Sequence, residues 1–530
     1  MNNIKYTRVV TADQMREMDM RSTTDFGISG IILMENAGRA VFDTAVDMMG
    51  GEVQGKCVLV ACGPGNNGGD GFVVARYLHQ AAARPVVVYY GDRDKAAGDA
   101  LMNIEIASAL KIPINDNPDP ATQWPAAESC HLVIDALLGT GAKGSPREPF
   151  GDAIAHINQY RRCGVPILSV DIPSGVEADT GSVPLHAVVS DRTVTFALPK
   201  IGLLTYPGAS HTGSLIVADI GIPAGLADDV AGDAVYINDW RTAESVCSNR
   251  QADAHKGSCG HVGIVAGSVG MTGAAVLTAT GALRIGSGLV TVLVPQSLND
   301  ILEIKLTEAM TVPVPEGKAR AFGVNSLGDV LSYVNKWDAA VIGPGLGRDS
   351  DTVEFVRQLI RQLKKPAIID ADALFAIAQE LSVLKECKAP LIITPHPGEM
   401  AMLTGTTVEK VESNRLDTAR SFAKKHKVTV VLKGANSLIA KPDGQAFINT
   451  TGSPGMATGG TGDVLSGMIG GLLAQKCDAV TAAAAAVYYH GLAGEIAADK
   501  FTEPAMLATG LADSIGDAIM QLRIKSAEQI

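Results

Sequence analysis

The chain has 530 residues, of which 46% are hydrophobic and 19% charged, and its formal net charge at pH 7 is −12. A domain usually contains roughly 100–200 residues, so this length predicts two to four domains. The composition is that of a folded globular protein and excludes a disordered one. The acidic balance argues against a nucleic-acid partner, because a phosphate backbone is bound by basic stripes and the sequence has none.

The eight cysteines and ten histidines show no spacing typical of a metal site or a disulfide framework. Most cysteines are therefore expected to be small core residues in a reducing compartment, and we expect a cytoplasmic protein. The first 19 residues carry charges and no apolar core, so they do not resemble a secretory signal. Residues 262–283 carry no charge and are long enough to span a membrane. Their glycines, serines and threonines instead favour a short strand, a glycine loop and a small-residue helix.

In the first half of the chain, apolar runs alternate with helical patterns such as 69–83 and 96–111. The runs that predict strands are 57–62, 85–90, 131–135, 166–171, 193–197 and 214–219. Continuous apolar strands separated by helices indicate a parallel sheet covered on both faces. Ligands of such sheets usually bind at the carboxyl ends of the strands.

Between residues 222 and 240 the pattern dissolves into Gly, Ala, Asp and Pro, which is typical of a boundary. A second alternating array follows, with strands expected at 261–266, 289–294, 339–342, 366–370, 390–394 and 428–432. We therefore predict an α/β protein of two domains, residues 1–225 and 241–530, joined by a linker at 226–240. The first is a Rossmann-like three-layer α/β/α domain and the second a further α/β/α domain. The halves share no motif, which excludes a tandem repeat.

Three loops in the first half follow apolar strands and carry polar residues. They are the glycine loop with Asn66, Asn67 and Asp70, the segment from Asp135 to Ser145, and Asp171 to Gly175. Amide groups in glycine turns bind anions, and carboxylate or carbonyl oxygens bind hard cations. Together the loops indicate an anionic ligand placed beside a small cation. For each loop alone, a tight strand–helix connection with Asn or Asp as helix cap is an equal alternative.

The motifs "GPGNNGGDG", "DALLGTG" and "DIPSG", in this order, resemble the NAD(P)H-hydrate epimerase domain, also called the YjeF N-terminal domain, over about residues 10–220. The resemblance implies interconversion of the two C6 epimers of a hydrated nicotinamide cofactor, with a bound potassium ion. It implies Asn67, Asp135 and Ser174 as potassium ligands, and Asp135 is the first candidate for the acid or base. The residues implied to line the substrate are Asn66, Asn67, Gly68, Gly69, Asp70, Gly139, Thr140, Gly141, Ala142, Lys143, Gly144, Ser145 and Asp171.

The strongest signal in the second half is "GGTGDVLSG", in which Asp463 follows a glycine turn at the start of a small-residue helix. An Asp there is well placed as a general base, with glycine amides to stabilise negative charge. The run "VVLKGANS" leads from a strand into Lys433, which is positioned to meet a nucleotide phosphate. His396 is as readily a loop residue satisfied by the backbone as a ligand contact. Asp370 and Asp372 are as readily helix caps as site residues.

These motifs, with "DAHKGSCGHVGIVAGS", "GPGLG", "DADAL" and "TPHPGEM", resemble the ribokinase-like fold. More narrowly they resemble the ADP/ATP-dependent NAD(P)H-hydrate dehydratase, over about residues 245–525. Thr461 and Ser437 depart from the common residues of the pattern but keep a hydroxyl. The resemblance implies a ribokinase-like C-terminal domain, with the nucleotide at Lys433, Gly434, Ala435, Asn436, Ser437 and Gly462. It implies the hydrated ring at Ala275, Gly345, Gly347, His396 and Asp463, with Asp463 as the catalytic base.

The resemblance implies ADP as co-substrate, with ATP as the alternative, and magnesium with the nucleotide. Phosphorylation turns hydroxide, a poor leaving group, into a good one, which explains why a dehydratase needs a nucleotide. An epimerase beside it delivers both C6 epimers to one dehydratase site. The expected ligands are hydrated NADH or NADPH and ADP, without nucleic acid or membrane, and a homo-oligomer is expected.

Two rival functions remain open at this point. Ribokinase-like folds also phosphorylate vitamin and sugar alcohols, so the second half fits a small-molecule kinase fused to a cofactor-binding domain. Epimerase-like domains also occur as scaffolds without activity. The motifs "TPHPGEM" and "DAHKG" favour the dehydratase, and the presence of Asn67, Asp135 and Asp171 together argues against a scaffold.

Overall fold

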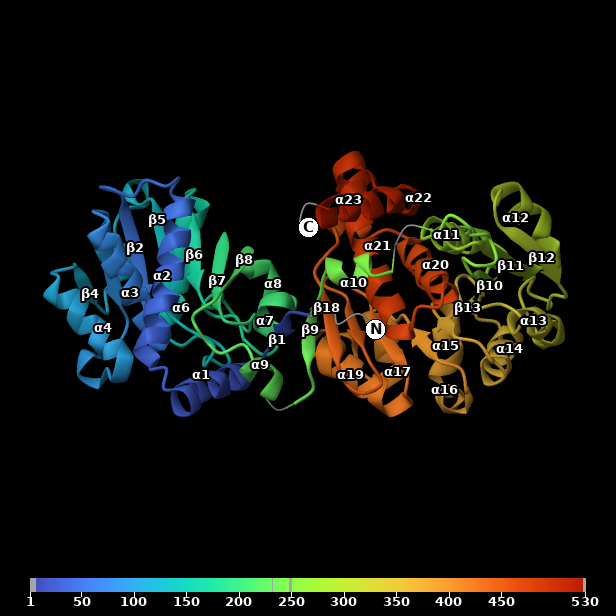
Figure 1. The fold of residues 1–530 in the computed structure, drawn as a ribbon, viewed down its shortest axis with the longest axis horizontal. Coiled ribbons are helices and arrows are strands. Elements are labelled where there is room, and N and C mark those ends of the chain that lie inside the picture. The colour runs from blue at the N-terminus through green and yellow to red at the C-terminus, as the bar shows by residue number, and fades with distance from the viewer. Residues whose placement is uncertain (1–5, 231, 247–249, 528–530) are drawn as a thin grey trace. The chain divides into compact units, whose positions relative to one another are not determined.

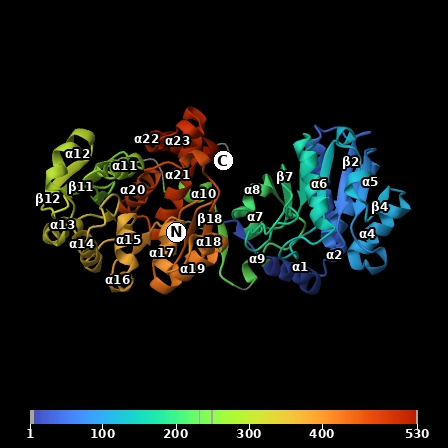
Figure 2. The same ribbon diagram turned by 180° about the vertical axis from the view of Figure 1, so that it is seen from behind.

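The chain forms two compact units, here named the N-terminal and the C-terminal unit (Figure 1). The computed structural model describes residues 6–230, 232–246 and 250–527. The outer ends of the two predicted domains, residues 1–5 and 528–530, lie outside the described residues. The N-terminal unit comprises Thr7–Gly232, and the other described residues, Tyr6 and those from Asp233 onward, form the C-terminal unit. Figure 2 shows the same ribbon from behind.

The N-terminal unit is built on a parallel sheet with strand order β4-β3-β2-β5-β6-β7-β8. Its longer helices connect successive strands, as the alternating pattern predicts. The elements are β1 (Arg8–Val9), α1 (Ala12–Phe26), α2 (Gly30–Met48), β2 (Cys57–Cys62), α3 (Asn66–Gln80), β3 (Arg84–Tyr89), α4 (Gly98–Ala109), β4 (Ile114–Asp116), α5 (Pro120–Gln123), β5 (Leu132–Ala136), α6 (Phe150–Arg162), β6 (Ile167–Val170), β7 (Arg192–Phe196), α7 (Ile201–Leu204), α8 (Ala209–Thr212), β8 (Ser214–Ala218) and α9 (Leu226–Asp229).

Both faces of this sheet are buried, because successive strand residues enter two different cores. In β2, Val58 and Val60 join a cluster that includes α2, α3 and α4. Leu59 and Ala61 point to the other face and join a cluster with α6. Side chains alternate along a strand, so a strand buried on both faces is apolar throughout. This is why the run 57–62 shows no polar residue.

The C-terminal unit holds a longer mixed sheet, in which the order from β9 onward is β9-β18-β17-β16-β15-β14-β13-β10-β11-β12. Strands β10 to β16 pair in parallel, and β17 is antiparallel to both β16 and β18. The elements are β9 (Val235–Asn238), α10 (Trp240–Glu244), β10 (His261–Val265), α11 (Thr272–Arg284), β11 (Leu289–Pro295), α12 (Asn299–Lys305), β12 (Met310–Val314), α13 (Leu327–Val334), β13 (Ala339–Ile342), α14 (Ser350–Arg361), β14 (Ala367–Ile369), α15 (Asp372–Ala378), α16 (Ser382–Glu386), β15 (Leu391–Ile393), α17 (Pro397–Thr404), α18 (Val408–Ser413), α19 (Arg415–His426), β16 (Thr429–Leu432), β17 (Leu438–Ala440), β18 (Ala446–Asn449), α20 (Thr461–Ala474), α21 (Ala479–Phe501), α22 (Ala508–Asp513) and α23 (Ile515–Ala527).

The segment 226–240, predicted as a linker, contains α9 and β9. Strand β9 pairs in parallel with β18, and the ring of Tyr236 lies near those of Tyr6 and Phe447. Asn238 is fully buried and donates to Asn449 Oδ1 and to the Ala484 carbonyl. A four-residue strand flanked by Gly and Asp gives no periodic signal, and only its tertiary partners define it.

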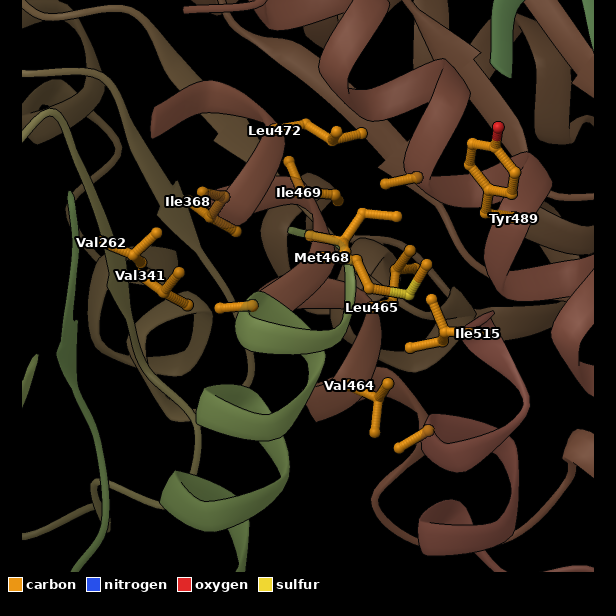
Figure 3. Close-up of a cluster of buried hydrophobic side chains, with 14 of the residues drawn as sticks. Val262, Val341, Ile368, Val464, Leu465, Met468, Ile469, Leu472, Tyr489 and Ile515 are labelled. Carbon is orange, nitrogen blue, oxygen red and sulfur yellow. The ribbon is translucent and has the colours of Figure 1, made fainter. Parts of the chain in front are cut away.

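The uncharged segment 262–283 contains nearly all of β10, a glycine loop and α11 up to its last residue, as its small residues indicate. None of the helices in the described ranges is long and apolar enough to cross a membrane. Helix α11 packs closely on α20 through glycines: a Cβ on Gly281 would lie 2.3 Å from the Val464 carbonyl oxygen, and one on Gly467 would lie 2.0 Å from that of Thr278. Beside this contact, Val464, Met468 and Leu472 enter the core (Figure 3).

Candidate active sites

A cavity of about 650 Å³ opens at the carboxyl ends of the strands of the N-terminal unit. It lies where the parallel topology predicts a ligand. Helices α1, α2 and α3 and the loops after β2, β5 and β6 supply its walls. The predicted site residues that line it are Asn66, Asn67, Asp70, Gly139, Thr140, Gly141, Ala142 and Asp171.

The glycine loop after β2 brings the start of α3 to this cavity. A Cβ on Gly63 would lie 1.9 Å from the Leu137 carbonyl oxygen, and one on Gly68 would lie 1.9 Å from that of Gly63. Only glycine permits such contacts, so these residues allow the loop to fold tightly under the loop after β5. Helix α3 begins at Asn66 with Gly65 as N-cap and no side-chain cap. Its first amide groups and the positive end of its dipole therefore favour an anion.

Asp135, predicted as a potassium ligand and as the acid or base, lies at the end of β5 and is fully buried. Four hydrogen bonds reach its carboxylate. Ser174 donates from Oγ at 2.5 Å and from its backbone N–H at 2.9 Å, Ser169 Oγ donates at 2.8 Å, and the Leu137 N–H donates at 3.3 Å. Burial raises the pKa of Asp135, against the lowering effect of these donors.

Asp135 is not among the cavity-lining residues, so its position does not support the predicted acid–base role. Instead it fixes the loop of Ser174, whose Oγ also accepts from the Leu138 N–H at 2.9 Å. Asn67 Nδ2 donates to the Leu138 carbonyl at 3.2 Å. Carboxylate, hydroxyl and carbonyl oxygens thus come together around Leu138.

Asp171 follows β6 in a left-handed backbone conformation, with φ of 63°. This strained conformation, unusual for a non-glycine residue, turns the side chain toward the cavity. Lys200 Nζ donates to Asp171 Oδ1 at 2.5 Å, and also to Thr195 Oγ1 and to the Phe196 carbonyl. Lys200 is fully buried, so the pair is a fixed ion pair in the wall of the site.

Two more carboxyl groups line the same cavity. Burial raises the pKa of Asp70 well above its usual value, and the charges of Asp171 and Asp19 add to the effect. Asp19 of α1 also has a pKa raised by burial, to about 6, where Lys200 opposes the shift and Asp171 adds to it. A group with a pKa near neutrality and access to a ligand is suited to proton transfer.

Other predicted residues of the first half lie outside the lining of this cavity. Gly68 and Gly69 are buried in packing, and Lys143, Gly144 and Ser145 are exposed. Residues that the sequence did not reveal include Arg16, Asp19 and Asp99, which line the cavity, and Lys200, which holds Asp171. They lie outside the glycine-rich motifs, and no spacing in the sequence connects them to the site.

In the C-terminal unit, the loops that follow β14, β15 and β16 bring a buried ion pair to the start of α20. Lys433 Nζ lies 2.9 Å from Asp370 Oδ1 and 3.9 Å from Glu399 Oε2. Ser466 Oγ donates to the other oxygen of Asp370 at 2.6 Å. Burial is the largest influence on the pKa of Asp370 and would raise it, but the charge and hydrogen bond of Lys433 and the hydroxyls of Ser466 and Thr394 together lower it. Asp370 is thus an anchor for Lys433, and neither it nor Asp372 caps α15.

Asp463 lies in the first turn of α20, three residues after the N-cap Gly460. Burial raises its pKa to about 7, the charge of Asp370 adds to this, and Lys433 opposes it. His490 of α21 fixes the same turn by donating from Nε2 to the Thr461 carbonyl at 2.8 Å. A half-buried carboxyl with a pKa near 7 at a helix N-terminus suits a general base that works beside an anion.

His396 is the N-cap of α17, where its Nδ1 accepts from the backbone N–H groups of Gly398 and Glu399. Burial lowers its pKa, and Lys433 and Arg348 lower it further, against the charge of Asp370. The ring is therefore neutral at pH 7 and fixed in orientation. More than half of its side chain is exposed, and its Nε2 lies 3.5 Å from Glu399 Oε1.

Gly345 and Gly347, predicted to contact the ring, have φ of 63° and 84°. A Cβ on Gly345 would lie 2.8 Å from the Met271 carbonyl oxygen, so the loop passes close over the start of α11. The N–H of Gly347 donates to Asp372 Oδ2 at 3.0 Å. Ala275 in the first turn of α11 is fully buried. Its side chain therefore supports the loop and does not reach the surface of the site.

The predicted nucleotide segment, Lys433 to Ser437, connects β16 to β17. Arg415 supports it by donating to the carbonyls of Leu432 and Lys433, and Ser437 Oγ donates to the Gly434 carbonyl. The Lys433 amine was expected to meet a phosphate, but it is held by Asp370. A Cβ on Gly462 would lie 3.4 Å from Lys433 Nζ, so this segment and the start of α20 adjoin.

Comparisons with known proteins agree with this division. The family model described as YjeF-related protein N-terminus matches residues 30–202, and the model described as NAD(P)H-hydrate dehydratase matches residues 262–517. Among solved structures, the ADP/ATP-dependent NAD(P)H-hydrate dehydratase from Bacillus subtilis, co-crystallised with ATP and Mg²⁺, is 30% identical with a TM-score of 0.47. It covers 54% of this chain and 98% of its own.

Two relatives match the chain over almost its whole length. The bifunctional NAD(P)H-hydrate repair enzyme Nnr of Moorella thermoacetica is 42% identical over 510 residues, which are 95% of each chain. The protein of the same name from Escherichia coli is 35% identical over 509 residues, 94% of this chain and 92% of its own. The chain belongs to the family of bifunctional NAD(P)H-hydrate repair enzymes.

Proposed function

We propose that the chain carries out both steps in the repair of hydrated NADH and NADPH. The N-terminal unit interconverts the two epimers at C6 of the hydrated ring, and the C-terminal unit dehydrates the S epimer at the expense of ADP. The observation that carries this proposal is the pair of sites within a family of two-step repair enzymes. One is a cavity with several carboxyl groups, and the other a glycine turn with a single half-buried Asp463.

In the dehydratase, Asp463 accepts the proton of the C6 hydroxyl while that oxygen attacks the terminal phosphorus of ADP, and AMP leaves. The amide groups at the start of α20 stabilise the negative charge that develops there. Phosphate then leaves C6 and a proton leaves C5, which restores the C5–C6 double bond. The nucleotide lies along residues 433–437 and Gly462, and the ring meets Gly345, Gly347 and His396. Magnesium, bound with the nucleotide, would neutralise phosphate charge.

In the epimerase, the residues around Leu138 fit a potassium ion. Hard cations prefer carboxylate, hydroxyl and carbonyl oxygens, which Asp135, Ser174 and Asn67 supply. The hydrogen bonds that reach Asp135 come from neutral donors, and its pKa is raised by burial. A carboxylate in that state gains from an added positive charge. Potassium would supply that charge and fix the loops, while the anionic part of the substrate binds at the start of α3.

The test is recovery of absorbance at 340 nm from a mixture of NADH-hydrate epimers, with ADP, with ATP or without nucleotide. We expect full recovery only with a nucleotide. Asp463→Asn should slow dehydration by about 10³-fold, because a positioned base contributes about 10²–10⁴-fold. The matched control is Asp417→Asn, an exposed residue in the first turn of α19. Absence of recovery with either nucleotide in the wild type would contradict the proposed function.

A further inference from the structure

Asp19 lies in the cavity of the N-terminal unit but belongs to none of the motifs that point to it. It is on α1, whose buried face is formed by Ala12, Met15, Met18 and Ser22. Asp19 is therefore displaced from the core side of the helix and borders the cavity, where it is half-buried.

The charged groups that face this part of the cavity come from several elements. Arg16 precedes Asp19 on α1, Asp70 is on α3, Asp99 on α4, and Asp171 and Lys200 lie beyond β6 and β7. Lys200 is committed to Asp171, with Nζ 2.5 Å from Oδ1. Asp19 has no such fixed cation, and its burial raises the pKa to about 6. The cavity thus holds one carboxylate in a fixed ion pair and one carboxyl, Asp19, whose raised pKa allows it to be protonated near neutrality.

We propose that Asp19 is the acid of the epimerase, which protonates the C6 hydroxyl of the hydrated ring, while Asp171, paired with Lys200, accepts the proton of the incoming water. This assignment rests on the proposed function of the N-terminal unit. It adds a residue of α1 to a site that the sequence places only on three strand-end loops.

The step balances as follows in atoms and charge. C6 of the hydrated ring carries a hydroxyl and is bonded to the ring nitrogen, whose lone pair can expel the hydroxyl once that oxygen is protonated. Asp19 gives its proton to the oxygen, the C–O bond breaks, and water and a ring iminium ion form. A water molecule then adds to the other face of C6 and passes one proton to Asp171. Exchange with solvent returns a proton to Asp19 and removes one from Asp171.

Compared with Asp70 and Asp171, which line the same cavity, Asp19 fits the acid best. Asp171 Oδ1 is engaged by the Lys200 amine at 2.5 Å, in a fixed ion pair. Asp70 is buried, with 8% of its surface exposed, and is less able to exchange its proton with water between turnovers. Asp19 combines access to the cavity with contact to solvent, which an acid must have if it is to be reprotonated in each cycle.

The first test follows the conversion of purified R-hydrate of NADH to the S epimer by chiral chromatography, without any nucleotide, so that the dehydratase is idle. We expect Asp19→Asn in the full chain to lower the turnover number by about 10²-fold while KM changes less than threefold. The control is Asp25→Asn, at the exposed end of the same helix. If the wild type does not exceed the buffer rate, the proposed epimerase function fails. If the wild type exceeds the buffer rate and Asp19→Asn turns over as fast as the wild type, the assignment of Asp19 is overturned.

The second test separates an acid from a structural residue. In Asp19→Ala, added formate or acetate should restore turnover in proportion to its concentration, because a small carboxylic acid can occupy the space left by the side chain. The Asp25→Ala variant should show no such response. Loss of activity in Asp19→Ala that neither acid restores would overturn the assignment.

A third measurement needs only the wild-type protein. Inversion in water enriched in oxygen-18 should place one labelled oxygen at C6 of each S product, because the original hydroxyl leaves as water. The initial rate of label uptake with the enzyme is compared with the rate of label uptake in buffer alone. Inversion without label would show that the C–O bond stays intact, and would remove the need for an acid at this oxygen.

Discussion

Asp135 and Asp370 occupy equivalent places in two different sheets, but their surroundings shift their pKa values in opposite directions. Each stands at the carboxyl end of a parallel strand, β5 or β14, and each is almost completely buried. Asp370 is paired with Lys433 and its pKa is lowered, although burial acts in the other direction. Asp135 receives hydrogen bonds from serine and backbone donors, and burial raises its pKa.

The difference shows what a buried carboxylate requires. Neutral donors satisfy the hydrogen-bonding capacity of the group, but they offset only part of the cost of removing a charge from water. In the C-terminal unit that cost is offset within the chain, by Lys433. Around Asp135 the causes that act on its pKa include no cation, and the proposed potassium ion would supply one. Four predictions test this contrast.

The largest loss of stability is expected when Lys433, the cation that the chain itself places beside Asp370, is replaced. Lys433→Met should destabilise the C-terminal unit by about 3–5 kcal/mol, because it leaves the buried Asp370 without a counter-charge. Hydrogen exchange followed by mass spectrometry, resolved to peptides of β14 and β16, measures the change in that unit alone. Lys441→Met, which removes a partly exposed amine near Asp443, is the control and should cost less than about 1 kcal/mol. Equal costs for the two variants would contradict the importance of the buried pair.

A smaller loss is expected from Asp135→Asn. The amide keeps an acceptor for one donor but presents an N–H₂ group to another, so about 1–3 kcal/mol should be lost from the N-terminal unit. Exchange of peptides in β5 and the Ser174 loop gives this value, with Asp116→Asn at the exposed end of β4 as the control. Epimerisation should slow because the loops shift, whereas dehydration of the S epimer should be unchanged. A variant that epimerises normally would argue against the positioning role.

The pH dependence of dehydration should reflect the Asp370–Lys433 pair, because both charges act on the pKa of Asp463. Burial and the charge of Asp370 raise the pKa of Asp463 to about 7. A general base works when deprotonated, so the single-turnover rate should rise about tenfold per pH unit below pH 7 and level off above it. Glu399, whose pKa burial also raises to about 7, titrates in the same range. Glu399→Gln should therefore keep this rise of the rate below pH 7. If the rise disappears in Glu399→Gln, the titration belongs to Glu399.

The smallest effect is expected from the ion itself. Potassium should stabilise the N-terminal unit by about 1 kcal/mol at five times its dissociation constant. Thermal unfolding in potassium, sodium or lithium chloride at equal ionic strength measures this, and Asp135→Asn should remove the difference between the salts. Equal stability of the wild type in all three salts would leave Asp135 without the external cation that the comparison requires.

The parallel cores of both units were predictable, because strands buried on both faces are apolar throughout and helices separate them. Strands such as β9, β17 and β18 were not, since short antiparallel or edge strands give little periodic signal. In the sites, the glycine loops stand out because close backbone approaches and positive φ angles require glycine, and Asp463 stands out because it follows such a loop at the start of a helix. Lys200 and Asp19 do not, because each reaches its site through the tertiary fold from an unremarkable stretch of sequence. The role of Lys433 likewise depended on a partner, Asp370, that lies far from it in the chain.

The close packing of α11 on α20 limits where the C-terminal unit can move. With Gly281 and Gly467 in contact with carbonyl groups of the facing helix, even one added methyl group would force the two backbones apart. The part of α11 from Thr278 to Gly281 and the part of α20 from Val464 to Gly467, directly after Asp463, are therefore one rigid floor. Nucleotide entry and product release have to be accommodated by the loops above it, so the amide protons of this floor should be among the slowest in the molecule to exchange, whatever ligand is bound.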